Sequence, residues 1–365
     1  MKVAIMGAGL SGLACAMELE RHGIEPIIFE KRRTVGDRFV NGEVFFSLFS
    51  RPVLDEIRYL SERHKLYLQP ITNINQLIVS APEATATLKG RVGFITSRGR
   101  HAQSLEGQLA RTVKTDIRFH SEESYEHVAQ HYTHVVLATG DATYTEKLQR
   151  FDTSSTVTLA GATVEGQFQP HQVQCWLDNS LAPHGGYGYV IPLSRREASL
   201  VVAYPEKHGF AAYDSQRQWD LFFRRAQKDL GQELKVTDTF EVNRYIMGLA
   251  QHPRIGNTFF VGNCFGALMP FMGFGQFQAI LTGIYAAWDI CGLGDYECLT
   301  EPLRHAHQNS LALRRAIEQM DNSRLNQVVD KLNGFWGRKL VETKVDVLKW
   351  GSYLARISSL GLRNS

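Results

Sequence analysis

Apolar residues near the beginning of the chain form two short runs on either side of a longer stretch with helical spacing. Residues 3–6 are four consecutive apolar residues, which predicts a buried strand of a parallel sheet. Leu13, Ala16, Met17 and Leu19 follow at helical spacing, and His22-Gly23 ends this predicted helix. A second apolar run at 26–29 predicts another strand, directly before Glu30. The pattern is that of a strand–helix–strand unit.

Three glycines at G-x-G-x-x-G spacing join the first strand to the helix. Gly7 permits the tight turn, Gly9 lets a pyrophosphate approach the backbone, and Gly12 lets helix and strand pack closely. The helix N-terminus offers free N–H groups and the positive end of its dipole to phosphates. Glu30, 18 residues after Gly12, can accept hydrogen bonds from a ribose diol. Because all parts occur in order, we predict a dinucleotide site rather than a plain core unit.

Apolar strands followed by small residues occur twice more, later in the chain. His134-Val-Val-Leu-Ala-Thr-Gly140 predicts a central strand, and its small-residue ending lets the backbone pass close to a dinucleotide. Residues 257–291 predict an apolar strand, a small-residue loop and a helix with a second N-terminal dipole. Between them, residues 155–204 contain strand patterns separated by turns, which favours an antiparallel sheet.

We therefore predict an α/β protein with a Rossmann-like dinucleotide domain, an inserted antiparallel β-sheet substrate domain and a C-terminal helical region. The predicted boundaries are 1–51, 94–150 and 244–295 for the discontinuous cofactor domain, 52–93 and 151–243 for the substrate domain, and 296–365 for the helices. The substrate domain is expected to contain a helix at about 212–230 and short strands at 76–80, 85–89 and 92–96.

Composition narrows the class of protein. The chain has 365 residues and a formal net charge of +3, which argues against a dedicated nucleic-acid binder. Its five cysteines form no C-x-x-C pair and their number is odd, which argues against disulfides and structural zinc. His131, His134 and His171 show no metal-ligand spacing, so no metal site is predicted. The first strand begins at residue 2 and no apolar run reaches the ~20 residues of a membrane span, so we expect a cytoplasmic protein.

From residue 1 to about 290 the chain resembles the FAD-dependent oxidoreductases of the geranylgeranyl reductase family, within the aromatic hydroxylase-like flavoproteins. The resemblance rests on the N-terminal glycines and on Gly262-Asn263…Pro270…Gly273-Phe-Gly275-Gln276, where Asn263 stands in place of the family's Asp. It also rests on Tyr187-Gly-Tyr189-Val-Ile191-Pro192, which matches a substrate-domain motif. The resemblance implies FAD as the cofactor. The predicted cofactor-binding residues are Gly7, Gly9, Ser11, Gly12, Glu30, Lys31, Asn41, Gly42, Arg98, Gly140, Gly262, Asn263, Pro270, Gly273, Gly275 and Gln276.

For some residues the sequence also predicts a specific role. Asn41-Gly42 stands where the family has a Cys-x-x-Gly-like segment beside the flavin, and Arg98 precedes Leu105 at the spacing of a family Arg that contacts FAD. Lys31 opens a cationic loop that either meets phosphates or is simply solvated. For a proton donor the candidates are Tyr187, Tyr189 and His184, of which we choose Tyr187.

The resemblance also implies an apolar substrate. Tyr187, Tyr189, Ile191 and Phe271 are predicted to line an apolar substrate cavity, although such residues taken singly are more often ordinary core. No second G-x-G-x-x-G follows a strand, so nicotinamide (NAD(P)H) must bind transiently or another donor such as ferredoxin must reduce the flavin.

The C-terminal stretch 334–365 is basic and amphipathic. It either lies on an anionic membrane surface or packs on its own domain. Three functions remain open: a reductase of C=C bonds in an apolar isoprenoid-like or lipid substrate, a monooxygenase of the aromatic hydroxylase type, and a non-catalytic prenyl- or lipid-binding carrier.

Overall fold

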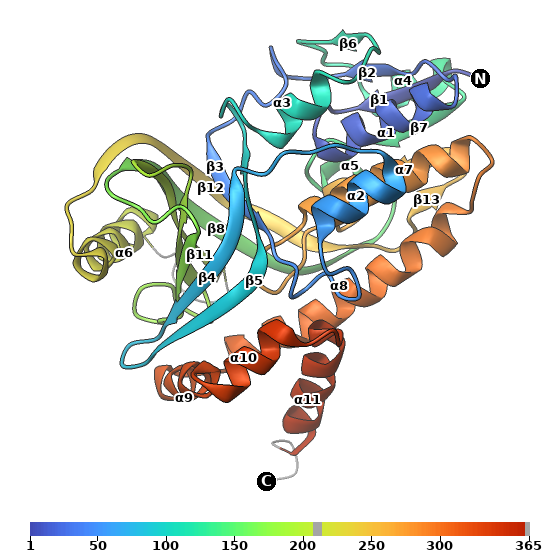
Figure 1. Ribbon diagram of the computed structural model, residues 1–365. Helices are drawn as coiled ribbons and strands as arrows, with labels where there is room; N and C mark the ends of the chain where they lie inside the picture. Colours follow the sequence, from blue (N-terminus) through green and yellow to red (C-terminus); the bar gives the residue numbers. More distant parts are fainter. Residues whose placement is uncertain (207–213, 362–365) are drawn as a thin grey trace. The chain divides into compact units, whose positions relative to one another are not determined.

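The computed structural model describes residues 1–206 and 214–361, with side chains up to residue 355. The chain forms two compact units (Figure 1). Unit 1 consists of residues 1–38, 98–154 and 246–308, and unit 2 of residues 39–97, 155–245 and 309–365. The α/β fold class predicted above, with a Rossmann-like domain and C-terminal helices, is confirmed.

Unit 1 contains a six-stranded sheet in the order β13-β14-β7-β1-β2-β6. The strands are β1 (Val3–Met6), β2 (Ile27–Phe29), β6 (Ile117–Arg118), β7 (His134–Leu137), β13 (Arg254–Ile255) and β14 (Thr258–Phe260). β1 lies between β2 and β7 and runs parallel to both, while β13 at the edge is antiparallel to β14. All four β1 residues are buried because both faces of the sheet are covered, as the apolar run predicted.

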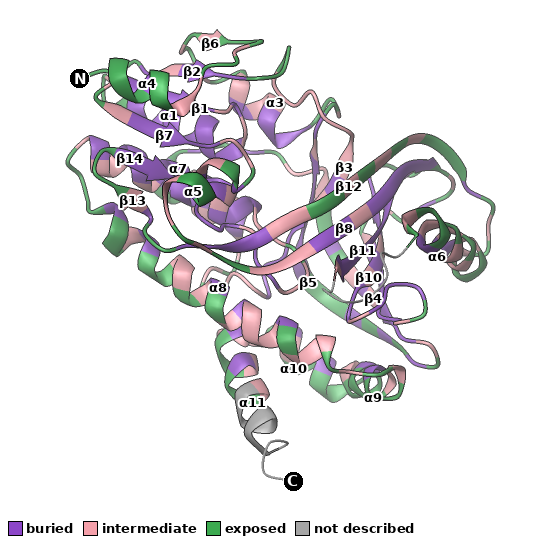
Figure 2. Ribbon diagram, turned by 180° about the vertical axis from the view of Figure 1, so that it is seen from behind, coloured by how far each residue is buried: buried purple, intermediate pink, exposed green. Residues whose placement is uncertain are grey.

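Helices cover both faces of this sheet. They are α1 (Leu10–Arg21), α3 (Leu105–Ala110), α4 (Tyr125–His131), α5 (Thr143–Leu148) and α7 (Gln276–Ile290). Ala4 and Met6 of β1 share a core cluster with Val128 of α4, whereas Ile5, which points to the opposite face, lies against Gly12 of α1. The α1 and α7 helices are in contact, since a Cβ on Gly283 of α7 would lie 2.1 Å from the Ser11 carbonyl oxygen. Figure 2 shows the central strands β1 and β7 mostly in purple, the colour of buried residues.

Unit 2 contains most of an eight-stranded sheet in the order β12-β8-β11-β10-β9-β4-β5-β3. The strands are β3 (Asn41–Phe45), β4 (Thr72–Ser80), β5 (Thr85–Arg98), β8 (Phe151–Glu165), β9 (Gln172–Trp176), β10 (Tyr187–Pro192), β11 (Glu197–Glu206) and β12 (Lys235–Ala250). β10 is antiparallel to β9 and β11, as predicted, but β4 runs parallel to β9. The three short strands expected between 76 and 96 are two longer ones, β4 and β5.

One face of this sheet is covered by α6 (Ser215–Leu230). Phe222 of α6 is fully buried, and its ring meets Trp176 of β9 edge-on at 5.4 Å. A Cβ on Gly188 of β10 would lie 2.1 Å from the Phe222 ring, so only glycine fits beneath this helix. The predicted helix at 212–230 overlaps α6, and its first two residues lie outside the described chain.

Residues 39–51 differ from the predicted boundaries. We assigned them to the cofactor domain, but they lie in unit 2, where β3 is the edge strand beside β5. The remaining helix of this part, α2 (Glu56–His64), also lies in unit 2, and Asp55 caps it by accepting from the Arg58 N–H at 2.8 Å.

The C-terminal helices do not form a separate region either. They are α8 (Tyr296–Glu318), α9 (Asn322–Leu332), α10 (Phe335–Glu342) and α11 (Val347–Gly361). From residue 309 onward the chain belongs to unit 2. Within the described residues, no helix combines the length and the apolar composition needed to cross a membrane.

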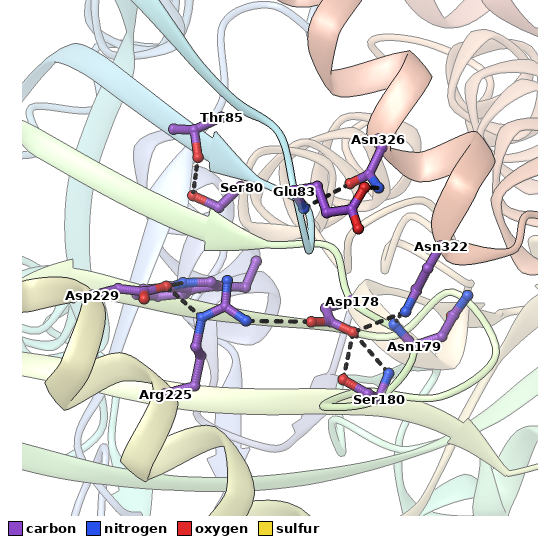
Figure 3. A network of polar contacts seen from close by, with 11 residues as sticks. Ser80, Glu83, Thr85, Asp178, Asn179, Ser180, Arg225, Asp229, Asn322 and Asn326 are labelled. Carbon is purple, nitrogen blue, oxygen red and sulfur yellow. Dashed lines mark hydrogen bonds and ion pairs between the residues drawn. The ribbon is translucent and has the colours of Figure 1, made fainter.

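A buried carboxylate explains how α9 is attached to the unit 2 sheet (Figure 3). Asp178, which follows β9 and is 4% exposed, accepts from the Ser180 hydroxyl at 2.6 Å and from the Asn322 amide at 3.2 Å. Arg225 of α6 pairs with Asp178 at 3.5 Å and with Asp229 at 2.7 Å. The network therefore ties α6 and α9 to one loop of the sheet.

Candidate functional site: a dinucleotide cradle in unit 1

The three N-terminal glycines differ in the space that surrounds them. Gly7 has φ +115°, and a Cβ there would lie 2.3 Å from the Ala138 carbonyl oxygen. A Cβ on Gly12 would lie 2.1 Å from the Gly7 carbonyl oxygen. A Cβ on Gly9, in contrast, would meet no atom within 4 Å. Packing thus requires Gly7 and Gly12, whereas the space above Gly9 is open to a ligand.

Two helix N-termini in unit 1 have neither a side-chain cap nor an acidic residue in the first turn. Gly9 is the N-cap of α1 and Gly275 is the N-cap of α7, and neither provides a side-chain acceptor for the first-turn N–H groups. Neither helix has an acidic residue in its first turn. Such ends bind anions through free N–H groups and the positive end of the dipole.

Glu30 lies at the end of β2 and is held by two backbone donors. Its Oε2 accepts from the Ala8 N–H at 2.7 Å, and its Oε1 accepts from the Arg32 N–H at 2.9 Å. Each carboxylate oxygen has a further lone pair, so the side chain can still accept from ribose hydroxyls. Lys31, the next residue, is exposed.

The Gly262–Cys264 turn (η1) joins three segments that are distant in sequence. The Gly262 N–H donates to Thr282 Oγ1 at 2.9 Å, and a Cβ on Gly262 would lie 2.6 Å from Ser11 Oγ. Asn263 Nδ2 donates to the Gly140 carbonyl at 3.2 Å. Ser11, Gly140, Gly262 and Asn263 therefore lie close together, at the C-terminal ends of β7 and β14 and the N-terminus of α1. Thr282 was not among the predicted residues, because a threonine inside an apolar helix carries no motif.

The 265–275 loop continues from this turn to α7. The Met269 N–H donates to the Phe274 carbonyl at 2.6 Å, and the Gly273 N–H donates to the Met269 carbonyl at 3.1 Å. These bonds close a tight loop around Pro270, which is buried, and Phe271, which is half-buried. Gln276 is 3% exposed at the first position of α7. The second glycine motif thus forms the entry to α7.

Arg98 lies at the end of β5 and forms an ion pair with Glu106 of α3. The Arg98 side chain is 22% exposed and that of Glu106 is 3% exposed. Next to it, a Cβ on Gly36 would lie 2.8 Å from the Gly99 carbonyl oxygen, so the 36–38 and 98–100 loops are in close contact. Glu106 is the ion-pair partner that positions Arg98. The spacing between Arg98 and Leu105, from which Arg98 was predicted, did not indicate Glu106.

Asn41 and Gly42 belong to unit 2, whereas the other predicted cofactor residues belong to unit 1. A Cβ on Gly42 would lie 2.9 Å from Ser199 Cβ and 3.1 Å from Ile191 Cγ2, so packing within the sheet accounts for this glycine. Asn41 Nδ2 donates to Glu43 Oε1 at 3.2 Å, and Ser199 Oγ donates to Asn41 Oδ1 at 3.4 Å.

The predicted substrate residues of β10 share one face of the unit 2 sheet. Tyr187, Tyr189 and Ile191 alternate with Gly188, whose face packs under α6. The two tyrosine rings stack with their centroids 6.0 Å apart. Burial raises the pKa of both tyrosine hydroxyls, so both stay protonated at neutral pH.

Two further sequence candidates lie outside β10. His184 has φ +56° in the turn before β10, whereas Phe271 belongs to unit 1. Among the residues the structure describes, no group of three His, Cys, Asp or Glu could hold a metal ion.

Other proteins resemble this chain in sequence or in structure. Residues 5–45 match the NAD(P)-binding Rossmann-like domain, so the N-terminal unit is a Rossmann-like nucleotide-binding domain. A geranylgeranyl bacteriochlorophyll reductase-like protein from Thermoplasma acidophilum has a similar structure, with a TM-score of 0.72 and 14% identity over 98% of this chain and 95% of its own. No curated protein matches the chain in sequence.

Other solved structures with this fold include a brominase and a monooxygenase. A flavin-dependent brominase has a TM-score of 0.66 and 13% identity over the full length of both chains. The p-nitrophenol 4-monooxygenase of Pseudomonas putida DLL-E4 has a TM-score of 0.64 and 14% identity over 96% of this chain and 97% of its own. At these identities the likeness establishes the fold of flavin-dependent oxidoreductases and monooxygenases.

The Asn263 amide provides the first testable expectation. Asn263→Asp removes the donor to the Gly140 carbonyl and places a carboxylate against that oxygen, which should lower the free energy of unfolding by about 1–2 kcal/mol. Urea unfolding of the purified protein measures the change. Asn257→Asp, at an exposed position before β14, is the matched control and should change stability by less than about 0.5 kcal/mol. Equal stabilities of the two variants would show that the Asn263–Gly140 bond has no structural role.

Proposed function

We propose that this protein is an FAD-dependent oxidoreductase that reduces C=C bonds of an apolar, isoprenoid-like substrate. The observation that carries the proposal is the pair of uncapped helix N-termini, α1 and α7, on two helices that contact each other in unit 1. With Glu30 beside the first of them, this arrangement suits a dinucleotide, which has two phosphates and a ribose diol.

The residues present fit the parts of FAD. The open space at Gly9 and the first turn of α1 would hold the pyrophosphate, and Glu30 would accept from the adenosine ribose. The Gly262-Asn263 turn and the first turn of α7 offer amide groups to the polyol chain between pyrophosphate and flavin. Asn263 keeps a carbonyl oxygen as acceptor while its amide nitrogen donates to Gly140.

A bound, reduced flavin would supply two electrons as hydride from N5 to one alkene carbon, while the other carbon takes a proton. We assign that proton to the Tyr187 hydroxyl, which burial keeps protonated and which is recharged from solvent after each turnover. Tyr189 and Ile191 would position the substrate, since they extend the same face of β10. NAD(P)H binding transiently, or a separate donor such as ferredoxin, would reduce the flavin.

The C=C reduction is supported by the geranylgeranyl bacteriochlorophyll reductase-like protein that shares the fold over nearly the whole chain. Aromatic and aliphatic side chains on the Tyr187 face of β10 also suit a substrate of low polarity. A monooxygenase is the second candidate, because the p-nitrophenol 4-monooxygenase has the same fold at a similar TM-score.

The decisive experiment begins with the visible spectrum of the purified protein, alone and after incubation with FAD. We expect a bound flavin spectrum. The flavin is then reduced anaerobically in D₂O and mixed with a geranylgeranyl lipid, and the reductase should reoxidise its flavin while deuterium appears at the saturated carbons. In a parallel reaction in air, oxygen uptake matched by a hydroxylated product would instead establish the monooxygenase. A colourless protein that FAD does not reconstitute would favour a lipid-binding carrier.

A further inference from the structure

Exposed apolar side chains are concentrated near the C-terminus of the described chain. Fourteen large apolar residues of that chain are exposed, and six of them lie between positions 335 and 354. They are Phe335 (62% exposed), Trp336 (69%), Val345 (48%), Trp350 (59%), Tyr353 (59%) and Leu354 (65%). We call these six residues the aromatic patch. Such a concentration of aromatic side chains in solvent marks an interaction surface.

The α11 helix buries Leu348, which is 3% exposed, but leaves three large apolar side chains in solvent. Trp350, Tyr353 and Leu354 follow i, i+3, i+4 spacing and therefore lie on one side of the helix. The other side contacts α8 through Ser352, which is 2% exposed and donates to Asn309 Oδ1 at 2.9 Å. A helix that only packs on its own domain would bury the tryptophan and expose the serine.

The α10 helix likewise packs with one side and exposes aromatic residues on the other. Its packing side is formed by Gly337, where a Cβ would lie 1.9 Å from the Leu332 carbonyl oxygen and 2.5 Å from Leu88 Cδ2. Phe335 and Trp336 remain outside, with their rings 5.6 Å apart and nearly perpendicular. Leu332 ends α9, which Asp178 fixes to the unit 2 sheet through Asn322 (Figure 3). The α10 part of the patch is therefore attached through α9 to the unit 2 sheet.

Cations surround the patch. Arg338, Lys339, Lys344 and Lys349 are exposed between positions 335 and 354. The same stretch contains only two acids, and both have partners. Glu342 pairs with Lys339 at 3.9 Å, and Asp346 caps α11 by accepting from the Lys349 N–H at 2.9 Å.

We propose that the aromatic patch and its flanking lysines bind the surface of an anionic lipid bilayer. Tryptophan and tyrosine have an apolar body and a polar edge that suit the headgroup boundary, and lysine can extend its charge to lipid phosphates. A second copy of the chain is a poorer occupant, because two patches with the same excess of cations would repel each other. The proposal rests on unit 2 alone and does not depend on the reaction proposed above.

Flotation of the full-length protein with lipid vesicles tests the proposal. We expect binding to phosphatidylcholine vesicles that contain about one third phosphatidylglycerol, little binding to phosphatidylcholine alone, and weaker binding as salt rises. Tryptophan emission should shift to the blue and be quenched by brominated acyl chains in the anionic vesicles. This measurement needs no variant.

Paired variants separate the two contributions. Trp336→Ser with Trp350→Ser should lower vesicle partitioning about tenfold or more, whereas Phe at both positions should retain most of the binding. Lys344→Glu with Lys349→Glu should lower it about twentyfold. Arg195→Glu with Arg196→Glu, two exposed cations in the turn between β10 and β11, is the matched control and should change it less than about twofold.

Three results would overturn the proposal. The first is no binding of the unchanged protein to anionic vesicles, and the second is serine variants that bind as well as the unchanged protein. The third is a dimer in sedimentation that the serine variants dissociate, without any vesicle binding, since this would show that a second copy covers the patch.

Discussion

Gly9→Ala should weaken FAD binding at least about a hundredfold and leave the protein folded. The added methyl meets no protein atom within 4 Å, and the backbone at φ −84°, ψ −174° suits alanine. It does occupy the space through which a pyrophosphate would approach the first turn of α1. Loss of two charge-assisted hydrogen bonds, at about 1.5–3 kcal/mol each, accounts for the expected change.

Quenching of FAD fluorescence on titration with apoprotein measures this affinity, and thermal unfolding in the absence of FAD checks the fold. Gly12→Ala is the contrasting variant. Its methyl would lie 2.1 Å from the Gly7 carbonyl oxygen, so this variant should lose stability as well as FAD. If Gly9→Ala bound FAD normally, the pyrophosphate could not lie over α1, and the assignment of unit 1 as the FAD-binding unit would fail.

Phe222→Ala should have the largest effect on stability, about 3–5 kcal/mol in the free energy of unfolding. Its ring is fully buried between Gly188 of β10 and Trp176 of β9, and glycine cannot fill the cavity that truncation would leave. Phe223→Ala, one position along the same helix, is the matched control. That ring is only partly buried and contacts Trp219 at 5.5 Å, so about 1–2 kcal/mol is expected.

Urea unfolding of both variants measures the difference. Because α6 packs against the face of β10 opposite Tyr187 and Tyr189, loosening this contact should also disturb the face proposed to position substrate. Comparable losses in the two variants would mean that Phe222 does not anchor α6.

These expectations connect the two units to separate roles. Unit 1 contains the uncapped helix ends and Glu30, all of which are available within one Rossmann-like domain. Unit 2 contains the tyrosine face and the aromatic patch. FAD affinity, substrate turnover and vesicle binding can therefore be tested with variants that do not overlap.

The sequence by itself determined the nucleotide-binding beginning of unit 1. Strand, glycines, helix, second strand and Glu30 are all within 30 residues, and their geometry follows from local backbone constraints. Apolar runs likewise predicted β7 and β14, since a strand covered on both faces is mostly apolar along its length. Tyr187, Tyr189 and Ile191 could be placed on one face for the same reason, because alternation along a strand is a local property.

Only the tertiary structure decided which of these elements meet. The contacts of Gly262 with Ser11 and of Asn263 with Gly140 join residues more than 100 positions apart, and hydrophobic periodicity identifies a buried face without naming its neighbour. The place of β3 in the unit 2 sheet depends on a Gly42 that packs against Ser199, and the attachment of the C-terminal helices depends on Asp178. In each case the deciding interaction is a contact between segments that are distant in sequence, which folding creates and no local pattern encodes.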